Sequence, residues 1–261
     1  MKLSISNIAW SKNSDEDMYL FLQEQEYSGL EIAPTRIFEE NPYEKLDEAK
    51  QFAIELKKRY GLKVSSMQSI WFGRNENIFG SVDERDELFK YTKKAIRFAE
   101  ACGCSNLVFG CPKNRIIKDS KDYSISVDFF RNLGEYAKLH ETNISIEPNP
   151  RIYNTNFINY TEEAFQLVSD VDSDGFNVNI DLGTIIYNKE DLSWVESNLN
   201  KVNHIHISEP NLQEINIRGI HREFAEKLKI NNYNKYVSIE MKNNENIELV
   251  RDIAKEIKKI F

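Results

Sequence analysis

Cysteine and long apolar runs are scarce in this sequence of 261 residues, and its 34 basic residues are outnumbered by 42 acidic ones. The formal net charge of −8 means that the field of the whole chain repels nucleic-acid phosphates and anionic membranes. No stretch reaches the roughly 18 apolar residues that a membrane-spanning helix needs. The first residues lack the apolar segment and the small-residue cleavage site of a signal peptide. We therefore expect a cytoplasmic protein that binds neither nucleic acid nor membrane.

The cysteines also point to a reducing compartment, because Cys102, Cys104 and Cys111 are 3 in number and leave at least one thiol unpaired. Cys102 and Cys104 are too close in sequence for a relaxed disulfide, and there is no second cysteine pair for a zinc knuckle. We interpret all three as buried apolar thiols. The 6 prolines and 10 glycines form no linker that would divide the chain. The length suits one large domain, so we expect a single domain over residues 1–261.

Eight short segments, most of them β-branched, recur along the chain with helical segments between them. The expected strands are Lys2–Asn7, Gly29–Ala33, Leu62–Gln68, Asn106–Gly110, Asn143–Glu147, Asn177–Asp181, Val202–Ile207 and Tyr236–Glu240. Clear helices are expected at Glu84–Cys102 and at Tyr43–Tyr60, the second between Pro42 and Gly61. Strands that alternate with helices pair in parallel through right-handed crossovers, and eight such units close a barrel. We predict an α/β fold, a single (β/α)8 TIM barrel, with an open doubly wound sheet as the alternative.

Each of the last four expected strands carries, at its last residue or the one before it, a side chain that can bind a metal ion. These are Glu147, Asp181, His206 and Glu240. Each has an ordinary explanation alone, since acidic residues often cap strand ends and a histidine in an apolar strand is usually a core residue. Because all four share one position in a repeating unit, and parallel strands end on the same side of a barrel, we predict that they converge on one divalent cation. Three carboxylates and one imidazole favour Mn²⁺ or Mg²⁺, with Zn²⁺ or Co²⁺ as alternatives.

The chain resembles the xylose isomerase-like barrel superfamily over nearly its whole length. The segments that carry the resemblance are Ile146–Asn149, Ile180–Gly183, His204–Glu209 and Ser238–Glu240. It points to the sugar phosphate isomerases/epimerases, which include tagatose-type epimerases, hydroxypyruvate isomerases and inosose dehydratases. The resemblance implies that the four residues hold one cation and that Glu147 and Glu240 are the catalytic pair that moves a proton. The expected function is that of a metal-dependent isomerase or epimerase of a small sugar or sugar phosphate, in carbohydrate metabolism.

This chemistry has a physical basis. A proton on the carbon beside a carbonyl is too weakly acidic for a carboxylate to remove unaided, so a cation must bind the carbonyl oxygen and a neighbouring hydroxyl and stabilise the enediolate. Two carboxylates on opposite sides of the substrate then decide the outcome. Return of the proton to the opposite face of the same carbon is epimerisation, and return to the adjacent carbon is isomerisation.

Two positions differ from the family pattern. Thr184 stands three residues after the aspartate, where members often carry histidine, and Leu212 stands where many epimerases carry arginine. The multi-zinc endonuclease IV branch needs additional histidines, and the 4 histidines and acidic charge of this chain argue against it. Two alternatives to the isomerase or epimerase stay open. The same ligands would serve a metal-dependent dehydratase of a keto-polyol, and a catalytically silent barrel would act as a binding subunit.

Further residues near the expected strand ends are candidates for substrate binding. They are Asn7, Gln68, Trp71, Lys113, Arg115, Glu209 and Lys242. Lys113 and Arg115 lie on a short loop, where they either grip a phosphate or carboxylate or pair with nearby acids. Trp71 either stacks on a sugar face or packs in the core. The expected partner is a small carbohydrate, and the sequence leaves open whether the chain forms a homo-oligomer.

Overall fold

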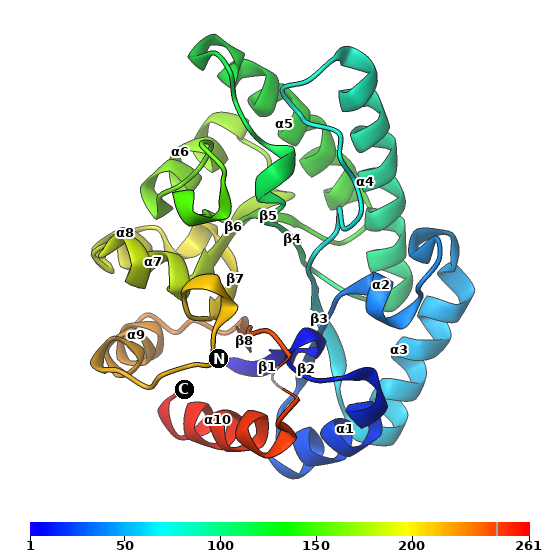
Figure 1. Cartoon of the computed structure of the whole chain (residues 1–261), viewed down its shortest axis with the longest axis vertical. Helices are drawn as coiled ribbons and strands as arrows, with labels where there is room; N and C mark the ends of the chain where they lie inside the picture. The colour runs from blue at the N-terminus through cyan, green and yellow to red at the C-terminus, as the bar shows by residue number, and fades with distance from the viewer. Residues whose placement is uncertain (244) are drawn as a thin grey trace.

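Eight parallel strands form a closed barrel in the computed structural model, which describes residues 1–243 and 245–261 (Figure 1). The strands are β1 (Lys2–Ser6), β2 (Gly29–Ile32), β3 (Lys63–Met67), β4 (Leu107–Phe109), β5 (Ile144–Ile146), β6 (Phe176–Asp181), β7 (Val202–Ile207) and β8 (Tyr236–Ile239). Each strand pairs with the next in sequence, and β1 pairs with β8. Every strand bound lies within one residue of its expected position. The predicted (β/α)8 barrel is therefore confirmed, and the alternative prediction of an open doubly wound sheet is wrong.

Helices form an outer ring around the barrel (Figure 1). They are α1 (Asp15–Glu24), α2 (Pro34–Ile37), α3 (Leu46–Tyr60), α4 (Val82–Cys102), α5 (Tyr123–Leu139), α6 (Thr161–Val171), α7 (Leu182–Asn188), α8 (Ser193–Ser197), α9 (Gly219–Ile230) and α10 (Ile247–Ile260). The two ends of the chain meet in this ring, because the hydroxyl of Tyr27, after α1, donates a 2.9 Å hydrogen bond to the carbonyl of Ala254 on α10. No helix in the described part of the chain is long and apolar enough to cross a bilayer.

The start of α3 differs from the prediction. Pro42 opens a separate three-residue 3-10 turn, and Lys45 (φ −98°, ψ 57°) interrupts the chain before α3 begins. The predicted end is confirmed, because Gly61 has a left-handed φ of 72° and its N–H bonds the carbonyl of Lys57. The helix expected at Glu84–Cys102 is α4, which begins two residues earlier.

The inside of the barrel is polar at many positions. Along β6 the buried side chains of Asn179 and Asp181 alternate with apolar residues, so the polar set points inward and the apolar set faces the helices. Hydrogen bonds between strands satisfy much of this interior, for example the 2.6 Å bond between the hydroxyls of Ser4 and Ser65. The same alternation brings polar side chains of β5 to β8 to the C-terminal end of the barrel, where the candidate site lies.

Candidate functional site

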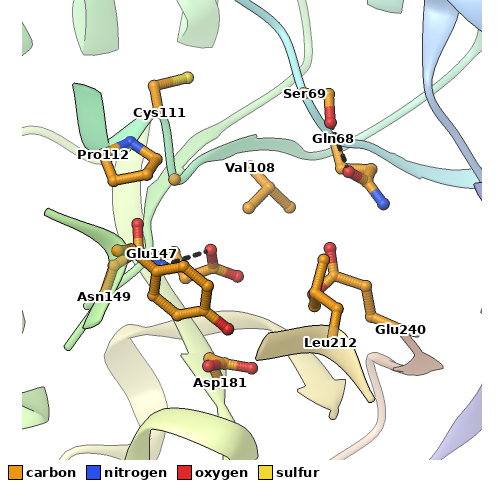
Figure 2. A pocket seen from close by; sticks show the side chains of 12 residues that line it. Gln68, Ser69, Val108, Cys111, Pro112, Glu147, Asn149, Asp181, Leu212 and Glu240 are labelled. Atoms are coloured by element: carbon orange, nitrogen blue, oxygen red, sulfur yellow. Dashed lines mark hydrogen bonds between the residues drawn. The ribbon is translucent and has the colours of Figure 1, made fainter. Parts of the chain in front are cut away.

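Four buried ionisable side chains converge at the C-terminal end of the barrel. Glu147 directly follows β5, Asp181 ends β6, His206 lies on β7 and Glu240 directly follows β8. One ligand atom of each lies within 4.8 Å of those of the other three. Figure 2 shows the three carboxylates around one cavity. We call these four residues the strand-end cluster, and their convergence is what the sequence pattern predicted.

Hydrogen bonds hold the carboxylates of the cluster in place. Oε1 of Glu147 lies 2.7 Å from Nδ1 of His206 and accepts a 2.7 Å bond from the amide of Asn179. Oδ2 of Asp181 accepts bonds from the backbone N–H (2.9 Å) and the hydroxyl (2.6 Å) of Thr184, and Oδ1 accepts one from the hydroxyl of Ser208. Thr184 thus orients a candidate ligand.

The cluster has more negative charge than its own histidine can balance. Burial and the charge of Glu147 raise the pKa of Asp181 to about 6. Burial likewise raises the pKa of Glu240 to about 7, although His206 opposes the shift. Burial also raises the pKa of Glu147, but the hydrogen bond and charge of His206 outweigh it and leave that pKa below its usual value. Burial lowers the pKa of His206, whereas Glu240 and Glu31 raise it, with a net value well above the usual one. Such a set of donors suits a divalent cation.

The cluster opens into a cavity of about 180 Å³. The residues that line it are Gln68, Ser69, Val108, Gly110, Cys111, Pro112, Glu147, Asn149, Tyr153, Asp181, Leu212 and Glu240. None of these side chains is a lysine or arginine, and three are carboxylates. The cavity therefore favours a small polar molecule without a negative charge, alongside a cation.

The sequence model of the xylose isomerase-like TIM barrel family matches residues 21–260. The chain belongs to this family. No curated protein matches it by sequence. The family fold agrees with the closed barrel, and the strand-end cluster lies where TIM barrels carry their active sites.

Solved structures of other proteins with a similar fold extend the comparison. A 3-keto-D-glucoside 4-epimerase of E. coli is 20% identical, with 99% of each chain covered and a TM-score of 0.79. A D-psicose 3-epimerase of Clostridium cellulolyticum H10 is 16% identical, with 99% of this chain and 97% of the other covered and a TM-score of 0.80. The probable 3-DHS dehydratase of Bacillus anthracis is 15% identical, with coverages of 100% and 98% and a TM-score of 0.72. At these identities the likeness shows the fold.

Of the seven residues expected to bind substrate, Gln68 lines the cavity of this xylose isomerase-like barrel. Its amide donates a 2.8 Å bond to the hydroxyl of Ser6, and its Oε1 accepts a 2.6 Å bond from Ser69. Two others are buried in structural contacts outside the lining. Asn7 accepts a 2.9 Å bond from the N–H of Ala33, and the indole of Trp71 donates to Thr92. Of the two roles that the sequence allowed for Trp71, the structure shows packing in the core.

The predicted anion-binding loop has a different geometry from the one expected. The 3-10 turn that begins at Pro112 directs Arg115 inward, where it is fully buried. Its Nη2 donates to the carbonyl of Glu147 (2.8 Å) and to Oδ1 of Asn149 (2.5 Å). Lys113 stays exposed, with its Nζ 3.4 Å from Asn75. Neither cation lines the cavity, and Arg115 supports the wall that holds Glu147.

Glu209 and Lys242 also lie outside the cavity lining. Glu209 is buried in an ion pair with Arg218, at 2.5 Å, which anchors the loop after β7. Lys242 lines a separate surface depression of about 480 Å³ that it shares with Leu212. Both residues therefore border the site without facing the strand-end cluster.

The cavity wall contains residues that were not among the seven expected to bind substrate. Asn149 donates a 3.0 Å bond to Glu147, and its place two residues after that ligand was the available signal. Tyr153 and Leu212 lie on different loops, and the hydroxyl of Tyr153 accepts a 2.8 Å bond from the N–H of Asn211. Cys111 lines the cavity, so the interpretation of all three cysteines as buried core thiols is wrong for this one.

Replacement of Arg115 by methionine is expected to lower kcat/KM by a similar factor for neutral and phosphorylated substrates. The change leaves the carbonyl of Glu147 and Oδ1 of Asn149 without a buried donor, and the expected drop in kcat/KM is on the order of tenfold to a hundredfold. Lys113→Ala is the matched control and should leave both values unchanged. Steady-state kinetics with a neutral sugar and with its phosphate ester test this. A loss confined to the phosphate ester would support the original prediction that Arg115 binds an anionic group of the substrate.

Added Mn²⁺, at a concentration a hundredfold above its Kd at pH 8, is expected to raise the midpoint of thermal unfolding of metal-depleted protein by about 5 °C. The same concentration should raise the midpoint by less at pH 6, where the Kd is weaker. Protons compete with the cation for carboxylates, and the pKa values of Glu240 and Asp181 are about 7 and about 6. Differential scanning fluorimetry at both pH values measures the shift. An equal shift with sodium chloride of matched ionic strength would contradict a specific site.

Proposed function

We propose that the protein is a divalent-metal-dependent isomerase or epimerase of a small sugar, in which Glu147 and Glu240 move the proton. The placement of these two glutamates carries the proposal. They follow β5 and β8, which are separated by β6 and β7, and both line the same cavity. Two carboxylates that approach one molecule from different strands can act on different sides of it.

The strand-end cluster fits a divalent cation, because its four donor atoms lie within 4.8 Å of one another and include three carboxylate oxygens. Asp181, His206 and the two glutamates would hold the ion. The oxygen-rich donor set favours Mn²⁺ or Mg²⁺, with Zn²⁺ or Co²⁺ as alternatives. When bound, the cation supplies electrostatic stabilisation of the negative charge that develops on the oxygen atoms of the sugar.

The protein side chains perform the proton transfer. Glu147, which is held by the amides of Asn149 and Asn179, takes a proton from the substrate carbon on its side of the cavity. Glu240 delivers a proton from the other side, and the two exchange roles in the reverse reaction. Both carboxylates are more than nine-tenths buried and line the cavity, so a substrate bound there meets them directly.

The cavity favours an unphosphorylated sugar over a sugar phosphate. Three carboxylates and no lysine or arginine line it, so with one divalent cation present its formal charge is still −1. A phosphate group would add negative charge without a cationic partner in the lining. The cavity volume of about 180 Å³ is small, so the cavity encloses a small sugar or a small part of a larger one.

A metal-dependent dehydratase of a keto-polyol is the second candidate. It needs an acid beside the leaving hydroxyl, and the phenol of Tyr153 lines the cavity. The similar fold of the probable 3-DHS dehydratase is compatible with this chemistry in the same barrel. The products separate the two functions, because a dehydratase releases water and changes the mass of the sugar.

The proposed function is tested with Mn²⁺-loaded protein and a panel of unphosphorylated ketoses and aldoses, each paired with its phosphate ester. NMR and mass spectrometry of the products are expected to show a sugar of unchanged mass, formed from an unphosphorylated member. A product that has lost one water supports the dehydratase instead. Binding of a panel sugar without conversion, with the cation present, contradicts both enzymes and supports a binding subunit.

A further inference from the structure

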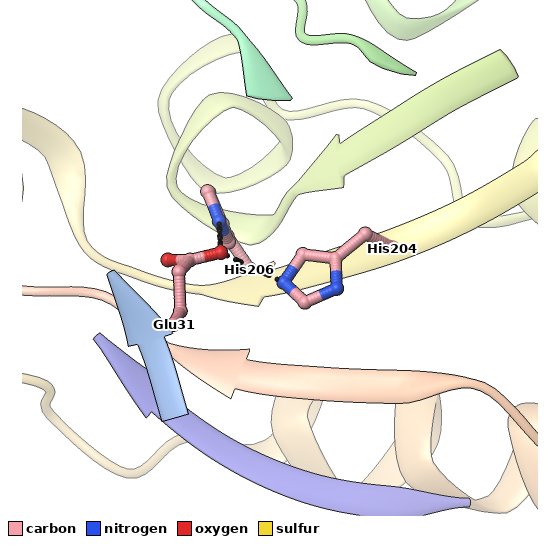
Figure 3. A group of neighbouring side chains, drawn as sticks. All are labelled: Glu31, His204 and His206. Atoms are coloured by element: carbon pink, nitrogen blue, oxygen red, sulfur yellow. Dashed lines mark hydrogen bonds and ion pairs between the residues drawn. The ribbon is translucent and has the colours of Figure 1, made fainter. Parts of the chain in front are cut away.

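A second group of buried ionisable residues lies beside the strand-end cluster, on the far side of the His206 ring (Figure 3). Glu31 on β2 is fully buried, and its Oε2 lies 3.0 Å from Nε2 of His206 and 2.9 Å from Nε2 of His204. His204 and His206 are two residues apart on β7, so both rings point into the barrel. Because β8 and β1 separate β7 from β2, Glu31 reaches the histidines across the barrel interior.

The two ring nitrogens of His206 face different groups. Nδ1 lies 2.7 Å from Glu147 and 3.2 Å from Glu240, on the side where the cation is proposed to bind. Nε2 faces Glu31 on the other side. An imidazole binds a metal ion through a nitrogen that carries no proton, and an ionised carboxylate can only accept a hydrogen bond. A proton on Nε2 therefore satisfies Glu31 and leaves Nδ1 free as the ligand atom.

The burial of Glu31 shows that this contact is more than packing. The polar contacts of its carboxylate within the described part of the chain are the two imidazoles, and its Oε1 has no hydrogen-bond partner there. A carboxylate buried in this way lowers stability unless its partners donate hydrogen bonds to it. An apolar residue would fill the same space at lower cost to folding, so the carboxylate has a role at the histidines.

We propose that Glu31 is a positioning residue that holds His206 with its proton on Nε2 and its Nδ1 directed at the cation. His204 lies 2.9 Å from the same carboxylate oxygen, but its Nε2 makes no hydrogen bond in the described part of the chain. This inference rests on the proposed function, since it requires a cation at the strand-end cluster. Carboxylates behind metal-binding histidines raise metal affinity by fixing the orientation and tautomer of the ring.

The first test measures Mn²⁺ affinity by isothermal titration calorimetry. Glu31→Gln keeps the size of the side chain and removes its charge, and it is expected to weaken Mn²⁺ binding about tenfold to a hundredfold. Ser65→Ala is the control, because it removes another buried polar contact of the barrel interior, that with Ser4. It should lower thermal stability without changing the Mn²⁺ affinity. Wild-type affinity in folded Glu31→Gln would overturn the role of Glu31 alone, whereas a wild-type protein that binds no Mn²⁺ would overturn this role and the proposed function together.

The second test needs no variant at Glu31. The chain has 4 histidines, so the ¹⁵N spectrum of histidine-labelled protein loaded with Zn²⁺ is simple enough to assign, with His206→Asn identifying one set of signals. The proposal expects His206 to carry its proton on Nε2 and to bind the ion through Nδ1. A proton on Nδ1, or Zn²⁺ on Nε2, would overturn it, even if Glu31→Gln fails to fold.

Discussion

Glutamine in place of Glu147 or of Glu240 is expected to lower turnover at least a hundredfold at saturating Mn²⁺. Glutamine keeps the size of the side chain and one ligand oxygen, but it cannot accept the substrate proton, and general acid or base groups contribute about this factor. The loss should appear in kcat more than in KM, because both variants keep the shape of the cavity. Steady-state kinetics with the best sugar of the panel, at full metal occupancy, measure it.

Glu100→Gln is the matched control for these two variants. Glu100 lies on α4, contacts His140 at 2.9 Å and is remote in the fold from the cavity lining. Its replacement should leave turnover unchanged. If both cluster variants turn over like the wild type with the cation bound, the two-carboxylate mechanism is wrong and the site acts through the cation alone.

The second large effect is expected on the cation itself. Asp181→Ala and His206→Ala should each lose stoichiometric metal, with an affinity at least a hundredfold weaker, because each removes one of four ligand atoms that converge within 4.8 Å. Metal analysis after gel filtration, with calorimetry on the metal-depleted proteins, gives the stoichiometry and Kd. His140→Ala is the control, since His140 lies at the end of α5, outside the barrel.

His206→Ala also removes a partner of Glu31, so a loss of metal in that variant could come from a less stable fold. Asp181→Asn avoids this problem, because asparagine preserves the size and hydrogen bonding of Asp181 better than alanine does. The thermal stability of both variants is therefore measured together with their metal content. A folded Asp181→Asn protein that has lost its metal supports the site without this complication. Stoichiometric metal in both alanine variants would show that the cation binds elsewhere.

The barrel and the strand-end cluster were predictable from sequence because they depend on periodicity. Eight short strand segments, each with apolar residues at alternate or successive positions, alternate with amphipathic helices, and a residue near the end of a parallel strand has its position fixed by the backbone. Glu147, Asp181 and Glu240 fall within one residue of a strand end, and His206 lies one residue before the end of β7. Their convergence follows from the closure of the barrel.

The substrate-binding residues were harder to predict because loop conformation depends on tertiary contacts. A charged residue such as Arg115 is expected at a surface, yet a 3-10 turn and Asn149 hold it in the interior. The left-handed φ of Leu212, 52°, belongs to a turn that places it in the cavity wall. Glu31 lies 175 residues from His206, and only the closed barrel brings them together.

Exchange of the substrate α-proton with solvent tests the central claim most directly. Wild-type protein with Mn²⁺ in D₂O is expected to place deuterium on the carbon beside the carbonyl of its sugar, whereas metal-depleted protein and the double variant Glu147→Gln/Glu240→Gln are not. A single glutamine variant is expected to retain exchange on its intact side while it loses net conversion. Wild-type exchange rates in the double variant with the cation bound, or in the metal-depleted protein, would contradict proton transfer between two glutamates at a divalent cation.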